Sequence, residues 1–143
     1  MKGPIQSVEI TYLIHATEDQ QKVGGAITKM LGIEAQPVAE RFEGHFGNEI
    51  ERVRIHFVGE DANLAFKAVA ERFPKDLKAE LLGNMGAFVD EHSSLFLRLD
   101  KQQLVAGTLA LGSGDSVRFK VKPRLFLLKG GAAEFYAHLI GEP

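Results

Sequence analysis

Strict alternation of apolar and polar residues predicts a β-strand over residues 6–14. One face of this strand carries large apolar side chains, namely Val8, Ile10, Tyr12 and Ile14. A helix should follow, because Thr17 and Gln20 have the spacing of a capping box and apolar residues then recur at helical intervals. We expect this helix to begin near Glu18 and to end at about Leu31.

Two further strands are predicted at residues 37–43 and 51–58. The second alternates strictly through Val53, Ile55 and Phe57. Between them lies the segment Gly44-His45-Phe46-Gly47-Asn48, whose two glycines and asparagine can supply the positive φ values of a tight connection. The pattern therefore predicts a β-hairpin.

The rest of the chain reads as short helices and strands in turn. Helical spacing of apolar residues predicts helices over 61–73, 77–88, 101–106 and 132–140. Asp61 should cap the first of these helices and Asp100 the third. Alternation of apolar and polar residues predicts strands over 94–99 and 116–122. Along the chain, the predicted strands include neighbours that can pair as a hairpin, and there is no sustained βαβ alternation. We therefore expect a single α+β domain over residues 1–143, with a mainly antiparallel sheet and helices packed on one face.

Composition narrows the class of protein. The chain has 143 residues, of which 45% are apolar and 25% charged, as in an ordinary globular domain. It contains no cysteine, which excludes disulfides, thiolate metal sites and a cysteine nucleophile. No apolar run approaches the roughly 20 residues that span a bilayer, and no secretory leader is apparent. We expect a cytoplasmic protein without a membrane partner and without a cofactor.

Basic residues alternate with apolar ones on two of the predicted strands. They are Arg52, Arg54 and His56 in one strand and Arg118, Lys120 and Lys122 in the other. If the strands share a sheet, these groups converge on one surface, joined by Arg98 from the strand between them in the sequence. They would form a local phosphate-binding patch although the formal net charge is −2. The alternative is a solvated face whose charges pair with Glu9 and Glu40.

Exposed aromatic side chains are scarce in this pattern, which favours contacts to the nucleic-acid backbone over base stacking.

Three short blocks carry a family resemblance. They are His15-Ala16-Thr17-Glu18-Asp19 with Lys22-Val23 following, Gly44-His45-Phe46-Gly47-Asn48, and Leu97-Arg98-Leu99-Asp100-Lys101-Gln102. In this order and spacing they resemble an archaeal family described as RNA-binding proteins or predicted exosome subunits. The resemblance implies a fold similar to that of ribosomal protein L5, with helices on one side of a sheet, and RNA, with exosome or ribosome-associated proteins, as partners.

We therefore expect a non-enzymatic RNA-binding protein, an accessory to exosome-linked RNA processing or decay. His45 and Asn48 of the hairpin loop are candidate RNA contacts, although turn geometry explains the same loop. Arg98, Lys101 and Gln102 are candidate phosphate ligands near a helix N-terminus. The ordinary alternative makes Asp100 a cap and Lys101 a solvated surface residue.

Two other functions fit the pattern. His15, Glu18, Asp19 and His45 are candidates for a metal or acid–base cluster of a small metal-dependent hydrolase. Capping and an i, i+4 pair between Glu18 and Lys22 explain most of these residues more simply. A protein–protein module that forms a homodimer is the third hypothesis.

Overall fold

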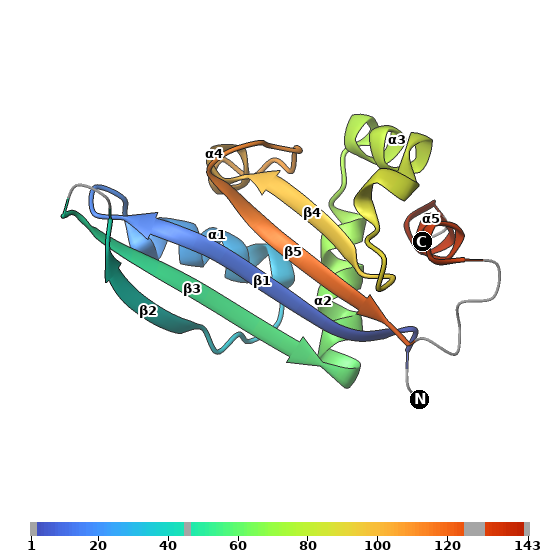
Figure 1. The fold of residues 1–143 in the computed structure, drawn as a ribbon, viewed down its shortest axis with the longest axis horizontal. Coiled ribbons are helices and arrows are strands. Elements are labelled where there is room, and N and C mark those ends of the chain that lie inside the picture. Colours follow the sequence, from blue (N-terminus) through green and yellow to red (C-terminus); the bar gives the residue numbers. More distant parts are fainter. Residues whose placement is uncertain (1–2, 45–46, 125–130, 142–143) are drawn as a thin grey trace.

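A five-stranded antiparallel sheet forms the centre of the computed structural model, which describes residues 3–44, 47–124 and 131–141. The strand order is β2-β3-β1-β5-β4 (Figure 1). The strands are β1 (Ile5–His15), β2 (Val38–Glu43), β3 (Glu49–Val58), β4 (Leu95–Asp100) and β5 (Ser116–Pro123). All four pairings are antiparallel, so the predicted sheet type is confirmed.

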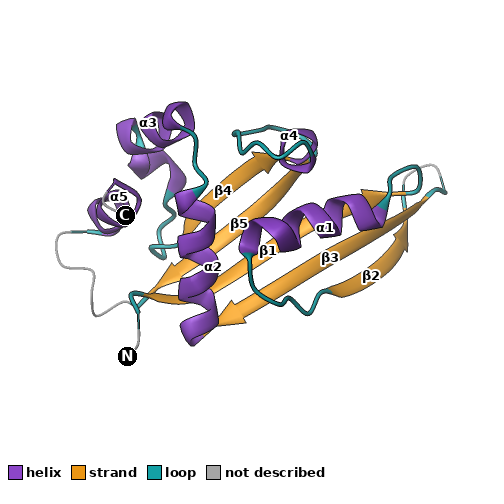
Figure 2. Cartoon of the chain, turned by 180° about the vertical axis from the view of Figure 1, so that it is seen from behind, coloured by secondary structure: helices purple, strands orange, loops and turns teal. Residues whose placement is uncertain are grey.

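The helices of the described chain lie on one side of this sheet, as predicted (Figure 2). They are α1 (Gln20–Leu31), α2 (Gly59–Glu71), α3 (Lys75–Gly83), the 3₁₀ helix η1 (Met85–Phe88), α4 (Lys101–Val105) and α5 (Ala132–Gly141). The other side, which we call the outer face, is covered by no helix of the described residues (Figure 1). None of the helices in residues 3–44, 47–124 and 131–141 is long and apolar enough to cross a membrane.

The core fills the space between the sheet and the helices. Four strands send alternate apolar side chains inward, whereas every side chain of the edge strand β2 is exposed. At one end, the Tyr136 hydroxyl of α5 donates to the carbonyl oxygens of Ser93 (2.7 Å) and Val121 (3.1 Å). Burial raises the pKa of Tyr136, so this hydroxyl stays a donor and ties α5 to the sheet.

Two helix starts differ from the predictions. The cap of α1 is Asp19 and not Thr17, because the Asp19 carboxylate accepts from the Gln21 N–H at 2.9 Å. Helix α2 begins at Gly59 without a side-chain cap, before Asp61.

The predicted helix over 77–88 is also broken, since α3 ends at Gly83 and a 3₁₀ turn follows. Asp100, in contrast, caps α4 as expected, through the Gln103 N–H.

Candidate nucleic-acid interface

The predicted basic strands share the outer face. Strand β1 lies between β3 and β5, and β4 adjoins β5. This arrangement places seven basic side chains on one surface, all exposed except the half-buried Lys120: Arg52, Arg54, His56, Arg98, Arg118, Lys120 and Lys122. The prediction that the two strands turn their basic residues to the same side of one sheet is confirmed.

One row across the sheet is rich in arginine. Arg54 is paired with Thr11, Thr11 with Arg118, and Arg118 with Arg98. Neighbouring strands lie about 4.8 Å apart, so the guanidinium groups start from closely spaced backbone positions. Within the described parts of the chain, none of these three guanidinium groups forms an ion pair or a side-chain hydrogen bond. Their positive charge is available to an anion.

Acidic groups neutralise this surface only in part. Arg52 pairs with Glu40 at 3.2 Å, as the solvated-face alternative expected. Glu9 lies between His56 and Lys120 but forms no salt bridge within the described residues. The strands of the outer face carry six arginines and lysines against three carboxylates, those of Glu9, Glu40 and Asp100, although the formal net charge of the chain is −2.

The outer face also carries two exposed aromatic rings, which the sequence reading missed. Phe42 of β2 is 43% exposed and Phe96 of β4 is 42% exposed. The Lys120 ammonium lies 5.5 Å from the centre of the Phe96 ring. The sequence does indicate the exposure of Phe96. Leu95, Leu97 and Leu99 point inward, so the residue between the first two points outward. The prediction that exposed aromatic side chains are scarce on this face holds for most of it, but it did not include these two rings.

Lys101 does not lie on the outer face of the sheet. Its side chain is fully buried. Its ammonium donates to the Leu13 carbonyl (2.9 Å) and to Glu18 Oε1 (2.7 Å), and it forms an ion pair with Asp115 Oδ2 (2.7 Å). Both expectations that placed Lys101 at the surface, as a phosphate ligand or as a solvated residue, are wrong, and Lys101 instead joins α4 to the end of β1.

Glu18 is part of the same cluster. Partial burial by itself would raise its pKa, but the hydrogen bonds from Lys101 and from the His15 N–H, together with the positive charge of Lys101, hold the pKa below its ordinary value. Glu18 thus pairs with Lys101, in place of the expected pair with the exposed Lys22.

The candidate metal or acid–base cluster forms only in part. His15 Nε2 lies 4.0 Å from Glu18 and 3.6 Å from Asp115, a residue that the sequence reading did not include. These three side chains offer ligand atoms within 4.8 Å of one another. The Lys101 ammonium already binds both carboxylates, so it competes with a metal ion for them. Asp19 caps α1 instead, and His45 lies outside the described residues.

Among the described residues of the hairpin loop, one glycine has a positive φ. Gly47 has φ +77°, whereas neither Gly44 nor Asn48 has a positive φ. The Gly44 N–H donates to the Asn48 carbonyl at 2.6 Å and closes the loop. Turn geometry therefore accounts for Gly47. Asn48 itself is exposed, and RNA contact by its side chain stays a prediction.

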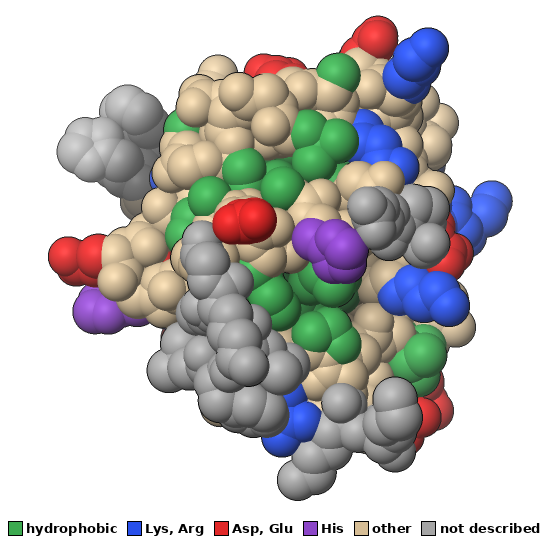
Figure 3. Space-filling model, turned by 90° about the vertical axis from the view of Figure 1, so that its right-hand side faces the viewer, with side chains coloured by type: hydrophobic (Ala, Val, Ile, Leu, Met, Phe, Trp, Pro, Cys, Tyr) green, Lys and Arg blue, Asp and Glu red, His purple; other side chains and the backbone are tan. Residues whose placement is uncertain are grey.

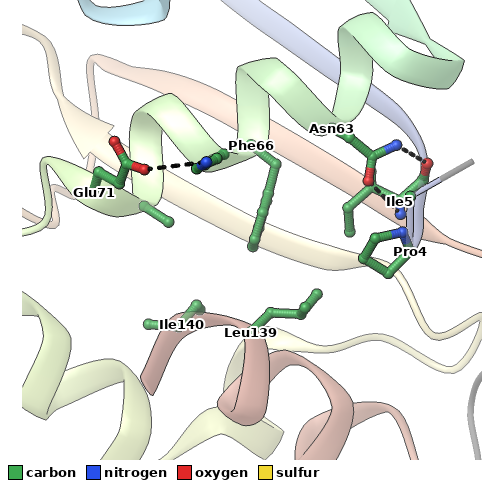
Figure 4. A pocket seen from close by; sticks show the side chains of 10 residues that line it. Pro4, Ile5, Asn63, Phe66, Glu71, Leu139 and Ile140 are labelled. Carbon is green, nitrogen blue, oxygen red and sulfur yellow. Dashed lines mark hydrogen bonds and ion pairs between the residues drawn. The ribbon is translucent and has the colours of Figure 1, made fainter. Parts of the chain in front are cut away.

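An apolar cavity of about 270 Å³ lies on the opposite side of the sheet, between α2, α5 and the start of β1 (Figure 4). Phe66 and Leu139 face it from the two helices. The Asn63 amide at its rim is already bonded to the Ile5 backbone. Figure 3 shows apolar side chains gathered at this end of the molecule. We assign the cavity no ligand, because its walls offer little besides apolar contact.

Comparison with known proteins shows the family of the chain. The chain is 28% identical to an RNA-binding protein of Pyrococcus abyssi over 90% of each chain. Crystal structures of proteins from Archaeoglobus fulgidus (TM-score 0.79, 27% identity, 94% of this chain and 99% of that one) and Sulfolobus solfataricus (TM-score 0.76, 25% identity, 94% and 97%) have the same fold. The model of a protein family described as RNA binding matches residues 7–123. The chain therefore belongs to this RNA-binding family, whose relatives named here are archaeal.

Proposed function

We propose that the chain binds RNA through the outer face of its sheet. The observation that carries the proposal is the row formed by Arg54, Arg118 and Arg98, three guanidinium groups without acidic partners in the described chain. Guanidinium groups bind phosphate through two parallel hydrogen bonds, which suits a polyanionic backbone. Arg52, His56, Lys120 and Lys122 extend the positive surface around this row.

The proposal includes the role of the protein. We infer that the protein is a non-enzymatic accessory to exosome-linked RNA processing or decay and that it acts in the cytoplasm. The proposal includes a fold like that of ribosomal protein L5. It also includes an RNA contact from Asn48 in the hairpin loop. The non-enzymatic role is supported by the cluster around His15, where Lys101 rather than an exchangeable ligand neutralises Glu18 and Asp115.

A filter-binding titration with single-stranded and structured RNA tests the surface. The double variant Arg54→Glu/Lys120→Glu reverses two charges on the outer face. The matched control Lys22→Glu/Lys75→Glu makes the same change in net charge at exposed positions on α1 and α3. We expect the first to weaken binding by at least about tenfold and the second to leave affinity within about twofold. Equal losses in both variants would contradict the assignment of this face.

Homodimerisation is an alternative use of the exposed edge strand β2. Edge strands present unpaired backbone groups that can join another sheet. Measurement of the protein's mass in solution tests homodimerisation. A monomeric mass at high protein concentration contradicts self-association.

A further inference from the structure

The two exposed rings lie at opposite ends of one depression in the outer face. A hollow of about 530 Å³ is bordered by Phe42, Arg52 and His15, and a second of about 320 Å³ by Phe96, Lys120 and Glu9. The two hollows share Thr11, Arg98 and Arg118 in their walls. They therefore adjoin each other at these three residues of the arginine row and together mark a path across the sheet.

This path runs diagonally. Phe42 shares a row with Ile50 and His15, whereas Phe96 shares a row with Lys120 and Glu9. From the strand order and these rows, the two rings lie on the order of 25–30 Å apart, because strands are spaced about 4.8 Å and residues rise about 3.4 Å along them. One nucleotide cannot reach both rings. A strand of at least about four nucleotides, the lower end of the site sizes of single-strand binding folds, can.

We propose that this depression binds single-stranded RNA, with one base stacked on Phe42, another on Phe96, and the intervening phosphates on Arg98 and Arg118. The inference rests on the proposed function and names its substrate class. A base can stack on a protein ring only where its face is free, which a continuous duplex does not offer. The pattern of exposed rings at both ends and unpaired guanidinium groups between them fits a single strand better than a helix recognised by shape.

The two ends differ in chemistry. At Phe96, the Lys120 ammonium covers one side of the ring, so a base stacks on the other side or displaces the ammonium toward a phosphate. At Phe42, the neighbouring Arg52 is held by Glu40, which keeps that end less positive. We therefore expect the Phe96 end to contribute more affinity per nucleotide.

Affinity measurements separate stacking from charge. Phe42→Leu and Phe96→Leu keep an apolar side chain and remove the ring, and Leu64→Ala, at an exposed site on α2, is the control. With an adenosine-rich single strand of about eight nucleotides, each Phe variant should lose roughly fivefold or more in affinity, since stacking on an aromatic side chain contributes strongly per base. Leu64→Ala should lose nothing, and a duplex of the same length should bind more weakly than the single strand to the unaltered protein.

A fluorescence experiment reports stacking directly. The chain contains no tryptophan, so Phe42→Trp, Phe96→Trp and the control Leu64→Trp each introduce a single indole. The single-stranded oligonucleotide should quench the first two indoles and not the third, and an abasic oligonucleotide of the same length should quench none of them.

The outcomes distinguish the two proposals. If no RNA binds in a salt-sensitive manner, the proposed function fails together with this inference. If RNA binds and Arg54→Glu/Lys120→Glu weakens it, but the Phe variants bind normally, the indoles are not quenched or the duplex binds more tightly, the proposed function stands and the single-strand inference is overturned.

Discussion

Arg98 and Arg118 stand directly opposite each other on β4 and β5, with no acidic partner for either guanidinium among the described residues. Like charges in directly opposed positions of an antiparallel pair destabilise a sheet. The pair is therefore unfavourable for folding alone, and an anion bound between the two groups would relieve the repulsion.

Replacing one member of this pair should separate stability from binding. In Arg118→Gln, the free energy of unfolding should rise by a few tenths of a kcal/mol because the repulsion is removed. RNA affinity should fall because a phosphate ligand is lost. Urea unfolding and RNA titration of the same preparation measure both. Lys75→Gln on α3 is the control, and a variant that binds RNA normally, or is clearly destabilised, would contradict this account of the pair.

Lys101→Met should destabilise the protein. The substitution keeps the buried stem but leaves Glu18 and Asp115 without their shared cation. We expect a loss of roughly 2–3 kcal/mol in the free energy of unfolding, below the range for fully buried pairs because Asp115 keeps contact with water.

Urea unfolding of Lys101→Met beside Lys22→Met, a change at an exposed position of α1, checks this expectation. The control should stay within about 0.5 kcal/mol of the unaltered protein. Equal stabilities of the two variants would show that Lys101 is not the tie between α4 and β1.

The pH dependence of the free energy of unfolding should reveal the contribution of Glu18. Its pKa in the folded protein lies below the ordinary value of 4.5, so the unfolded chain takes up the proton first as the pH falls. The stabilisation is complete above about pH 4.5 and is lost as the pH falls through the folded-state pKa. Urea unfolding between pH 3 and pH 7 should therefore show that the unaltered protein has a higher free energy of unfolding than Glu18→Gln. This difference should shrink only at the acid end of the range. A difference independent of pH would refute the assignment.

Tyr136→Phe removes a hydroxyl that serves two carbonyl oxygens, those of Ser93 and Val121. Loss of a buried donor should lower the free energy of unfolding by about 1–2 kcal/mol. Thermal or urea unfolding measures the loss. RNA affinity of the same variant is the internal control and should not change, since Tyr136 lies on the helix side of the sheet. Normal stability would show that α5 is held by apolar packing alone.

The strands could be predicted from the sequence because their periodicity is unambiguous. Alternation through Val53, Ile55 and Phe57 identified both β3 and the face on which Arg52 and Arg54 lie. The same rule turns Phe96 outward, so its exposure was predictable. The helix starts were harder, because Thr17 and Asp19 are both good caps and only the path of the chain selects one.

The role of Lys101 could not be predicted, because its partners Glu18 and Asp115 come from two other segments, the first of them 83 residues away in the sequence. A lysine next to a capping aspartate is usually solvated, and only the tertiary fold brings the carboxylates to it. The local sequence pattern therefore identified the basic face, whereas the ion pairs of the buried Lys101 depend on tertiary packing.

The salt dependence of RNA binding tests the central claim most directly. Each phosphate contact to a single strand contributes about 0.7 to the slope of log affinity against log salt concentration. We predict that Arg54→Gln/Arg98→Gln reduces the magnitude of this slope by about 1.4, whereas Lys22→Gln/Lys75→Gln on the helix side leaves it unchanged. Identical slopes for both variants and the unaltered protein would contradict RNA binding by the outer face.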